Sequence, residues 1–195
     1  MTTENNKIVL DCDCILLDYI PAFIEWVEEH KGFMVDPNGD RSSYNMSEWF
    51  YDMTPHDFVE LIEEYNSYPR IIPAVEHAVE NVKRLKTAGY SITVVTSFGG
   101  SPGSSQFRKD YLNLLFRDCF DEIIVLELGA CKKDVLASIK PKYFVDDADH
   151  YLQEGLNLGI TCISLTTSYN GYTDSIYVNN WNEINYIIGD IKEVA

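Results

Sequence analysis

The sequence predicts an α/β protein with a doubly wound, Rossmann-like parallel sheet and a small inserted helical cap. The branched apolar run from Lys7 to Leu10 is typical of a buried strand. From Pro73 onward, strand-like and helix-like segments alternate, a pattern that favours a parallel sheet with right-handed crossovers. Residues 18–71 interrupt this alternation with a helical, aromatic stretch. We therefore expect a core formed by residues 1–17 and 72–195, and a cap formed by residues 18–71.

The expected cap carries its own helix signals. Residues 18–31 place aromatic and aliphatic side chains at helical spacings, and residues 33–46 are rich in turn formers. A short helix is expected to begin at Ser47. Another is expected to begin at Thr54, whose hydroxyl can cap it, with a proline in the first turn.

The expected core alternates short strands and helices. The segment 99–103 is expected to be a flexible turn, because it is rich in glycine and lacks the lysine of a phosphate-binding loop. The apolar spacing predicts strands at 7–10, 91–96, 123–126, 143–145 and 161–165. It predicts helices at 75–88, around Phe107 to Leu115 (with Phe107, Tyr111, Leu114 and Leu115), at 132–139, a helix that ends near Leu158, and one at 181–194.

Composition restricts the partners. The chain has 195 residues, 46% of them hydrophobic, which suffices for a substantial core. Lys and Arg number 15 against 31 Asp and Glu, a formal charge of −16. A surface for polymeric nucleic acid would need a basic stripe, so we expect no such partner. An anionic small molecule would need local compensation from a metal ion or a positioned lysine.

The distribution of apolar and cysteine residues indicates the compartment. The polar N-terminus carries no apolar signal core, and no apolar stretch reaches membrane-spanning length. The five cysteines are odd in number and scattered, which favours buried reduced thiols over a zinc site. We expect a soluble, cytoplasmic protein without a membrane partner. A homodimer is compatible with the sequence, which does not decide the oligomeric state.

Polar side chains follow three of the expected strands. Ligands of doubly wound sheets bind beyond the carboxyl ends of the strands, so these residues should meet at one edge. Carboxylates this close need a cation between them or a shared proton. Their oxygens suit Mg²⁺, and a bound Mg²⁺ would make a phosphate group welcome. The residues are Asp11 and Asp13, Thr96 and Ser97, and Asp146 and Asp147.

Such a set can support phosphoryl transfer. An ionised aspartate can attack phosphorus, and a second carboxyl group can protonate the leaving oxygen and then activate water. A hydroxyl group and a lysine would hold the phosphoryl oxygens as charge develops on them.

Four segments, spread over nearly the whole chain, resemble the motifs of the haloacid-dehalogenase-like (HAD) phosphohydrolase superfamily and follow one another in the family's order. They are Ile8-Val9-Leu10-Asp11-Cys12-Asp13, Val94-Val95-Thr96-Ser97, a lysine before a short helix, and Phe144-Val145-Asp146-Asp147.

The resemblance implies a role for each residue and a Mg²⁺ cofactor. Asp11 would be the nucleophile and Asp13 the general acid/base. Thr96, Ser97 and a lysine would bind the phosphoryl group; we favour Lys132 over the adjacent Lys133. Cys14 stands where the family usually has a small residue such as glycine. The expected metal ligands are Asp11, the main-chain carbonyl of Asp13, Asp146 and Asp147.

The order of landmarks from the cap to the second strand is similar to the 5′(3′)-deoxyribonucleotidase branch. This likeness implies a nucleoside monophosphate as substrate, with one or two cap aromatics stacking on the base. A sugar phosphate or another small metabolite ester is the first alternative, and an inactive HAD-like binding domain is the second. A signalling receiver domain would not need the insertion, and Asp13 disfavours a dehalogenase. The candidate aromatics are Tyr19, Phe23, Trp26, Tyr44, Trp49, Phe50 and Tyr51.

Overall fold

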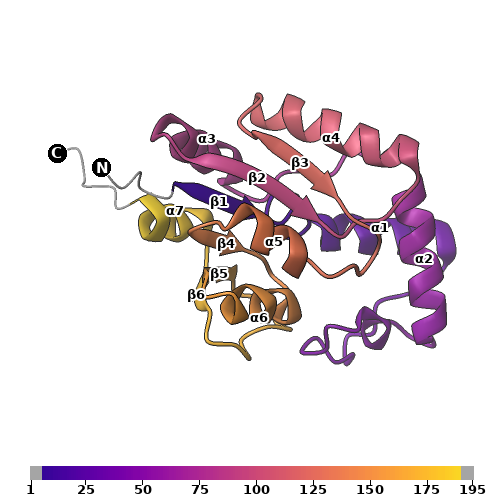
Figure 1. Ribbon diagram of the computed structural model, residues 1–195. Helices are drawn as coiled ribbons and strands as arrows, with labels where there is room; N and C mark the ends of the chain where they lie inside the picture. The colour runs from indigo at the N-terminus through magenta and orange to yellow at the C-terminus, as the bar shows by residue number, and fades with distance from the viewer. Residues whose placement is uncertain (1–5, 190–195) are drawn as a thin grey trace, which may run out of the picture.

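The computed structural model describes residues 6–189 and contains one six-stranded sheet within that range (Figure 1). All neighbouring strands are parallel, in the order β3-β2-β1-β4-β5-β6, which confirms the predicted doubly wound sheet. The chain builds outward from β1 on one side and then returns to build the other, so the topological switch point lies between β1 and β4. The strands are β1 (Lys7–Leu10), β2 (Ser91–Thr96), β3 (Glu122–Val125), β4 (Tyr143–Val145), β5 (Thr161–Leu165) and β6 (Ile176–Val178).

Helices cover both faces of the sheet. Alternate strand residues point to opposite faces, so Ile8 and Leu10 belong to one apolar cluster and Val9 to the other. The first cluster is closed by α3 (Ala78–Thr87), α4 (Pro102–Phe116) and α7 (Trp181–Gly189). The second is closed by α5 (Lys133–Ile139) and α6 (Asp149–Asn157).

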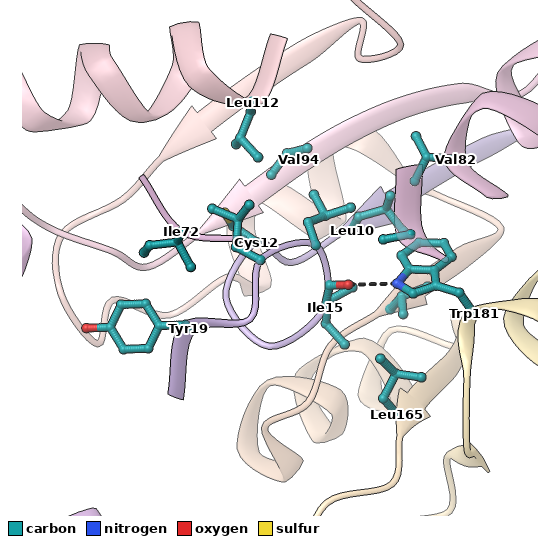
Figure 2. Close-up of a cluster of buried hydrophobic side chains, with 14 of the residues drawn as sticks. Leu10, Cys12, Ile15, Tyr19, Ile72, Val82, Val94, Leu112, Leu165 and Trp181 are labelled. Carbon is teal, nitrogen blue, oxygen red and sulfur yellow. Dashed lines mark hydrogen bonds between the residues drawn. The ribbon is translucent and has the colours of Figure 1, made fainter. Parts of the chain in front are cut away.

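Trp181 fastens the last helix to the loop that follows the first strand. Its indole is fully buried, and Nε1 donates a hydrogen bond of 2.7 Å to the carbonyl of Ile15 (Figure 2). Leu10, Cys12, Val82 and other apolar side chains surround the pair (Figure 2). The loop that contains Asp11 and Asp13 is therefore held against the hydrophobic core.

The segment 18–71 contains α1 (Tyr19–Lys31), the 3₁₀ helix η1 (Met46–Trp49) and α2 (Pro55–Ser67). Both α1 and α2 lie beyond the arrowheads of β2 and β3 (Figure 1). The expected cap on α2 is confirmed: Thr54 and Asp57 form a reciprocal capping box. Gly32 ends α1 with a left-handed φ of 75°, as a C-terminal glycine does.

Three features differ from the predictions. The strand β6 was not predicted, because three residues are too few to display a period. The segment 99–103 is not a single turn: Ser101 caps α4 and Pro102 is its first residue. The apolar residues from which this helix was predicted do not form its buried face. Leu114 is 77% exposed, and the buried residues are Ser104, Arg108, Leu112 and Phe116.

The structure also bears on the predicted C-terminal helix, the cysteines and the absence of membrane spans. The predicted helix 181–194 is observed to Gly189, and its remainder lies outside the described residues. All five cysteines are free, but Cys131 is exposed, so the expectation of buried thiols was wrong there. None of the helices between residues 6 and 189 combines the length and apolar character that a bilayer crossing requires.

Candidate active site

Three carboxylates meet where the chain leaves β1 and β4. Leu10 pairs in register with Val145, so the residues that follow them emerge side by side. The carboxylates of Asp11, Asp146 and Asp147 are buried, and one oxygen of each lies within 4.8 Å of the others. The parallel register at the switch point therefore creates this cluster.

Lys132 lies inside the carboxylate cluster. Its Nζ donates to Asp11 Oδ1 at 2.6 Å and to Asp146 Oδ2 at 2.7 Å, and its side chain is fully buried. Its backbone N–H donates to Glu154 Oε2 at 2.8 Å, which ties the start of α5 to α6. Lys133, by contrast, is exposed on the first turn of α5. Of the two adjacent lysines, only Lys132 contacts the cluster.

Burial shapes the electrostatics of the cluster. Burial raises the pKa of Asp11 well above its usual range; Lys132 opposes this rise and the neighbouring carboxylates add to it. Burial and then Asp146 raise the pKa of Asp147 to about 7, against a hydrogen bond from Tyr169. Counted in their ionised forms, three carboxylates against one ammonium group give the cluster two formal negative charges. That charge and the all-oxygen donor set fit one Mg²⁺ ion.

Asp13 also faces the site but is held differently. The chain does not stay extended after Leu10, because Leu16 N–H donates to the Cys12 carbonyl in a tight turn. The carboxylate of Asp13 accepts a hydrogen bond of 2.5 Å from Arg108 Nη1. Its side chain therefore stands apart from the three clustered carboxylates.

Arg108 was missed by the sequence analysis. It is 4% exposed, bonds Asp13, and lies 4.2 Å from the centre of the Phe98 ring. Burial alone would lower the pKa of the guanidinium, but the Asp13 carboxylate reverses this and raises it. Arg108 lies four residues after Ser104 and four before Leu112, so the three share one face of α4. The sequence would have revealed Arg108 only if this buried face had been identified.

Cys14 adopts a left-handed conformation, with a φ of +63°. This conformation is strained for residues with a Cβ, and glycine adopts it freely. The position where the resembled family has a small residue thus has a backbone that favours glycine.

Two hydroxyl residues, Thr96 and Ser97, lie where β2 ends, at the same edge of the sheet. Thr96 ends β2, is 2% exposed, and lines the cavity above the cluster. Ser97 also lines the cavity, and its hydroxyl donates to the carbonyl of Ala130 at 2.8 Å.

Tyr169 is a second residue that the sequence analysis missed. Its hydroxyl donates to Asp147 Oδ2 at 2.5 Å, and Asn170 Nδ2 donates to the Asp147 carbonyl at 3.0 Å. Both residues lie in the loop after β5. No local pattern marks them, because their role depends on a partner more than twenty residues away.

A cavity of about 310 Å³ opens above the carboxylates. The site residues form one end of it, and α1 and α2 contribute side chains to its wall. Its lining includes Asp11, Asp13, Thr96, Ser97, Lys132, Asp146 and Asp147 from the core, and Tyr19, Ile20, Tyr44, Met46, Phe58, Val59, Ile62 and Asn66 from the segment 18–71.

Most of the seven candidate aromatics are not in the cavity. Only Tyr19 and Tyr44 line it. Phe23, Trp26 and Tyr65 pack against one another with ring centroids 5.2–6.3 Å apart, deep between α1 and α2. Trp49 and Phe50 are buried, and Tyr51 is exposed without lining the cavity.

No family model matches this chain, and no curated protein matches it by sequence. Solved structures do match. A haloacid dehalogenase-like hydrolase from Streptococcus pneumoniae has a TM-score of 0.64 at 15% identity, over 93% of this chain and 97% of that one. A protein named as a predicted phosphatase from Clostridium acetobutylicum gives 0.65 at 17%, over 96% and 99%.

A protein named as a predicted phosphoglycolate phosphatase from Haemophilus somnus gives a TM-score of 0.59 at 14% identity, over 96% of this chain and 99% of that one. These matches span nearly the full length of this chain and of each matched chain. The chain therefore has the α/β fold of the HAD-superfamily hydrolases.

Proposed function

We propose that this protein is a Mg²⁺-dependent phosphomonoester hydrolase that works through an aspartyl phosphate on Asp11. The observation that carries the proposal is the position of Asp11. Its carboxylate lies in the cavity, at the switch point, within a three-carboxylate cluster and bonded to a buried lysine. The similarity to HAD-fold proteins named as phosphatases supports the same reaction class.

Each step has a residue to perform it. A carboxylate oxygen of Asp11 attacks phosphorus, and the ester P–O bond breaks as Asp13 gives its proton to the leaving oxygen. Asp13 then takes a proton from the water that cleaves the aspartyl phosphate, which releases inorganic phosphate and restores Asp11. Arg108 keeps the Asp13 carboxylate oriented. Thr96, Ser97 and Lys132 hold the phosphoryl oxygens.

Mg²⁺ would be held by Asp11, Asp146, Asp147 and the main-chain carbonyl of Asp13. When bound, it neutralises the charge on the phosphoryl group and the carboxylates. Tyr169 and Asn170 position Asp147 through hydrogen bonds to its carboxylate and its main-chain carbonyl.

The segment 18–71 would act as the cap over a catalytic core of residues 1–17 and 72–195. Its helices supply the cavity wall that contacts the alcohol part of the ester. Nucleoside monophosphates are one substrate class for this site, supported by the two tyrosines, Tyr19 and Tyr44, that line it. Small sugar or metabolite phosphates fit the carboxylate end equally well, and a neighbour named as a phosphoglycolate phosphatase supports them.

The test is turnover of a phosphate-ester panel with the purified protein, with Mg²⁺ and with EDTA. Wild-type protein should release phosphate only with Mg²⁺, and borohydride should trap a phosphorylated aspartate at residue 11. Asp11→Asn should show neither signal. Asp18→Asn is the matched control, because Asp18 is an exposed aspartate nearby whose side chain makes no cap hydrogen bond. Full turnover in EDTA, or a trapped phosphoenzyme in Asp11→Asn, would refute the proposal.

A further inference from the structure

The cavity has two chemically different ends. One end holds the carboxylates, Lys132 and the hydroxyl of Thr96, and the polar aromatic residues of the lining lie beside them: Tyr44, His150, Tyr151 and Tyr169. The other lies between α1, α2 and the loops after β2 and β3, and its walls are apolar. They comprise Ile20, Phe58, Val59, Ile62, Phe98 and Leu128. A substrate held by its phosphoryl group at the first end must place its alcohol part against the second.

The cavity offers no permanently charged partner for a second negative charge: His150 lines it, but burial lowers the pKa of its imidazole and favours the neutral form. Among its lining side chains, all within residues 6–189, Lys132 is the sole lysine or arginine. Its ammonium group already bonds Asp11 and Asp146. Arg108, the nearest buried cation on α4, is paired with Asp13. A carboxylate or second phosphate on the substrate would therefore lose water without gaining a counter-charge.

The apolar end also offers little for hydroxyl groups or base edges. Asn66 is the polar residue there, and it is 3% exposed. Its Oδ1 accepts from the Tyr19 hydroxyl at 3.0 Å, and its Nδ2 donates to the Phe98 carbonyl at 2.9 Å. Both ends of the amide and the phenol hydrogen of Tyr19 are thus engaged within the protein. A polar alcohol part would leave its own groups unpaired.

Apolar side chains extend from this end to the surface. Val59 on α2 is 47% exposed and Leu128, in the loop after β3, is 41% exposed, and both line the cavity. Exposed apolar side chains around a concave site are typical of ligand contact. From the apolar wall, the single engaged cation and an amide whose oxygen and nitrogen both bond within the protein, we propose that the preferred substrate is the phosphate monoester of an uncharged, apolar alcohol or phenol. This inference rests on the proposed phosphatase activity, and it ranks apolar esters above the nucleotides and the sugar phosphates considered for that activity.

The experiment compares esters that differ in one feature. Butyl phosphate and 3-carboxypropyl phosphate have similar length and differ in one carboxylate; glycerol phosphate adds hydroxyl groups, and a deoxyribonucleoside monophosphate adds a base. With Mg²⁺, kcat/KM for butyl phosphate should exceed that for 3-carboxypropyl phosphate by roughly 100-fold or more. It should also exceed the values for glycerol phosphate and the nucleotide.

Variants in the wall should change this ranking. Ile62→Ala should lower kcat/KM for butyl phosphate by roughly 10-fold, because it removes apolar contact. Its control is Ile71→Ala, at a 77% exposed isoleucine outside the cavity. Val59→Arg should reduce the preference for butyl over 3-carboxypropyl phosphate by about 3- to 5-fold. Leu114→Arg, at an exposed leucine on α4, should not alter the preference.

A binding measurement separates this inference from the proposed function. Calorimetry with phenylphosphonate and 4-carboxyphenylphosphonate, both with Mg²⁺, needs no turnover. Tighter binding of phenylphosphonate without hydrolysis of any ester would refute the phosphatase activity and retain the apolar pocket. Hydrolysis with equal or better use of the carboxylated ester, glycerol phosphate or the nucleotide would refute the apolar substrate class. So would a Val59→Arg protein that folds and keeps the wild-type preference.

Discussion

Replacement of Lys132 by methionine tests the electrostatic design of the site. Methionine has a similar length and no charge, so the change removes the ammonium group without opening a large cavity. It breaks two ion pairs of 2.6 and 2.7 Å at a fully buried position and leaves three clustered carboxylates without a cation. Breaking a buried ion pair from one side costs about 3–5 kcal/mol. For a chain of this size, that loss lowers Tm by roughly 6–20 °C.

The assay is thermal unfolding in EDTA, with Lys133→Met as the matched control. Lys133 is adjacent and exposed, so its replacement should change stability by no more than about 0.5 kcal/mol. Added Mg²⁺ should raise the Tm of Lys132→Met more than that of the wild type, because a divalent cation then supplies the missing positive charge. Phosphatase turnover should stay about 10²- to 10³-fold below wild type even with Mg²⁺, since a donor to the phosphoryl group is gone.

Wild-type stability for Lys132→Met in EDTA would refute this account of the cluster. An equal loss in Lys133→Met would refute the assignment of the lysine. Absence of any Mg²⁺-dependent rise in Tm in either protein would contradict the metal site.

Four other outcomes follow from the geometry. Asp13→Asn should slow turnover by roughly 10²- to 10⁴-fold, because proton transfer to the leaving group is lost; single-turnover kinetics measure this. Cys14→Gly should be about 1 kcal/mol more stable than Cys14→Ala in urea, because alanine keeps the left-handed strain at φ +63° and glycine does not. Trp181→Phe should cost about 1–3 kcal/mol in urea, because the buried Ile15 carbonyl loses its donor. Wild-type protein should gain thermal stability with Mg²⁺ but not with Na⁺ at equal ionic strength, since one divalent ion fits the net charge of the cluster.

Each of these has a contrary result. Normal turnover in Asp13→Asn would remove that carboxylate from the chemistry. Equal stability of the alanine and glycine variants would mean that no strain is stored at residue 14. An unchanged urea midpoint in Trp181→Phe would show that the indole hydrogen bond adds nothing to stability. An equal rise in Tm with Mg²⁺ and with Na⁺ would indicate charge screening instead of Mg²⁺ binding.

Much of the fold and half of the site could be predicted from the sequence. Asp11 and Asp146 each follow an apolar strand and Thr96 ends one, and parallel strands necessarily bring their carboxyl ends to one edge. The prediction therefore required only the strand pattern and the polar residue at each end. Lys132 was similarly placed by its position before a short helix, although the choice over Lys133 depended on a resemblance.

The aromatic residues show where sequence reasoning stops. Phe23 and Trp49 were expected among the candidates for base stacking, yet both are buried in the core. An amphipathic helix that covers a site has an inner face toward the core and another toward the cavity, and the sequence does not say which aromatic lies on which. Phe58, Leu61, Ile62 and Tyr65 are all apolar or aromatic residues of α2. Phe58 and Ile62 line the cavity, whereas Leu61 and Tyr65 are buried.

What the sequence determined by itself is local: the order of strands and helices, the capping of α2 by Thr54, and the acidic residues at strand ends. These depend on spacing within a few residues. The tertiary structure alone decided the pairing of Arg108 with Asp13 across 95 positions and the bond from Trp181 to Ile15 across 166. It also decided that the cavity wall is apolar and nearly without free cations. Such features arise because folding brings distant side chains into a low-dielectric interior, where only a partner's proximity determines which charges and polar groups are satisfied.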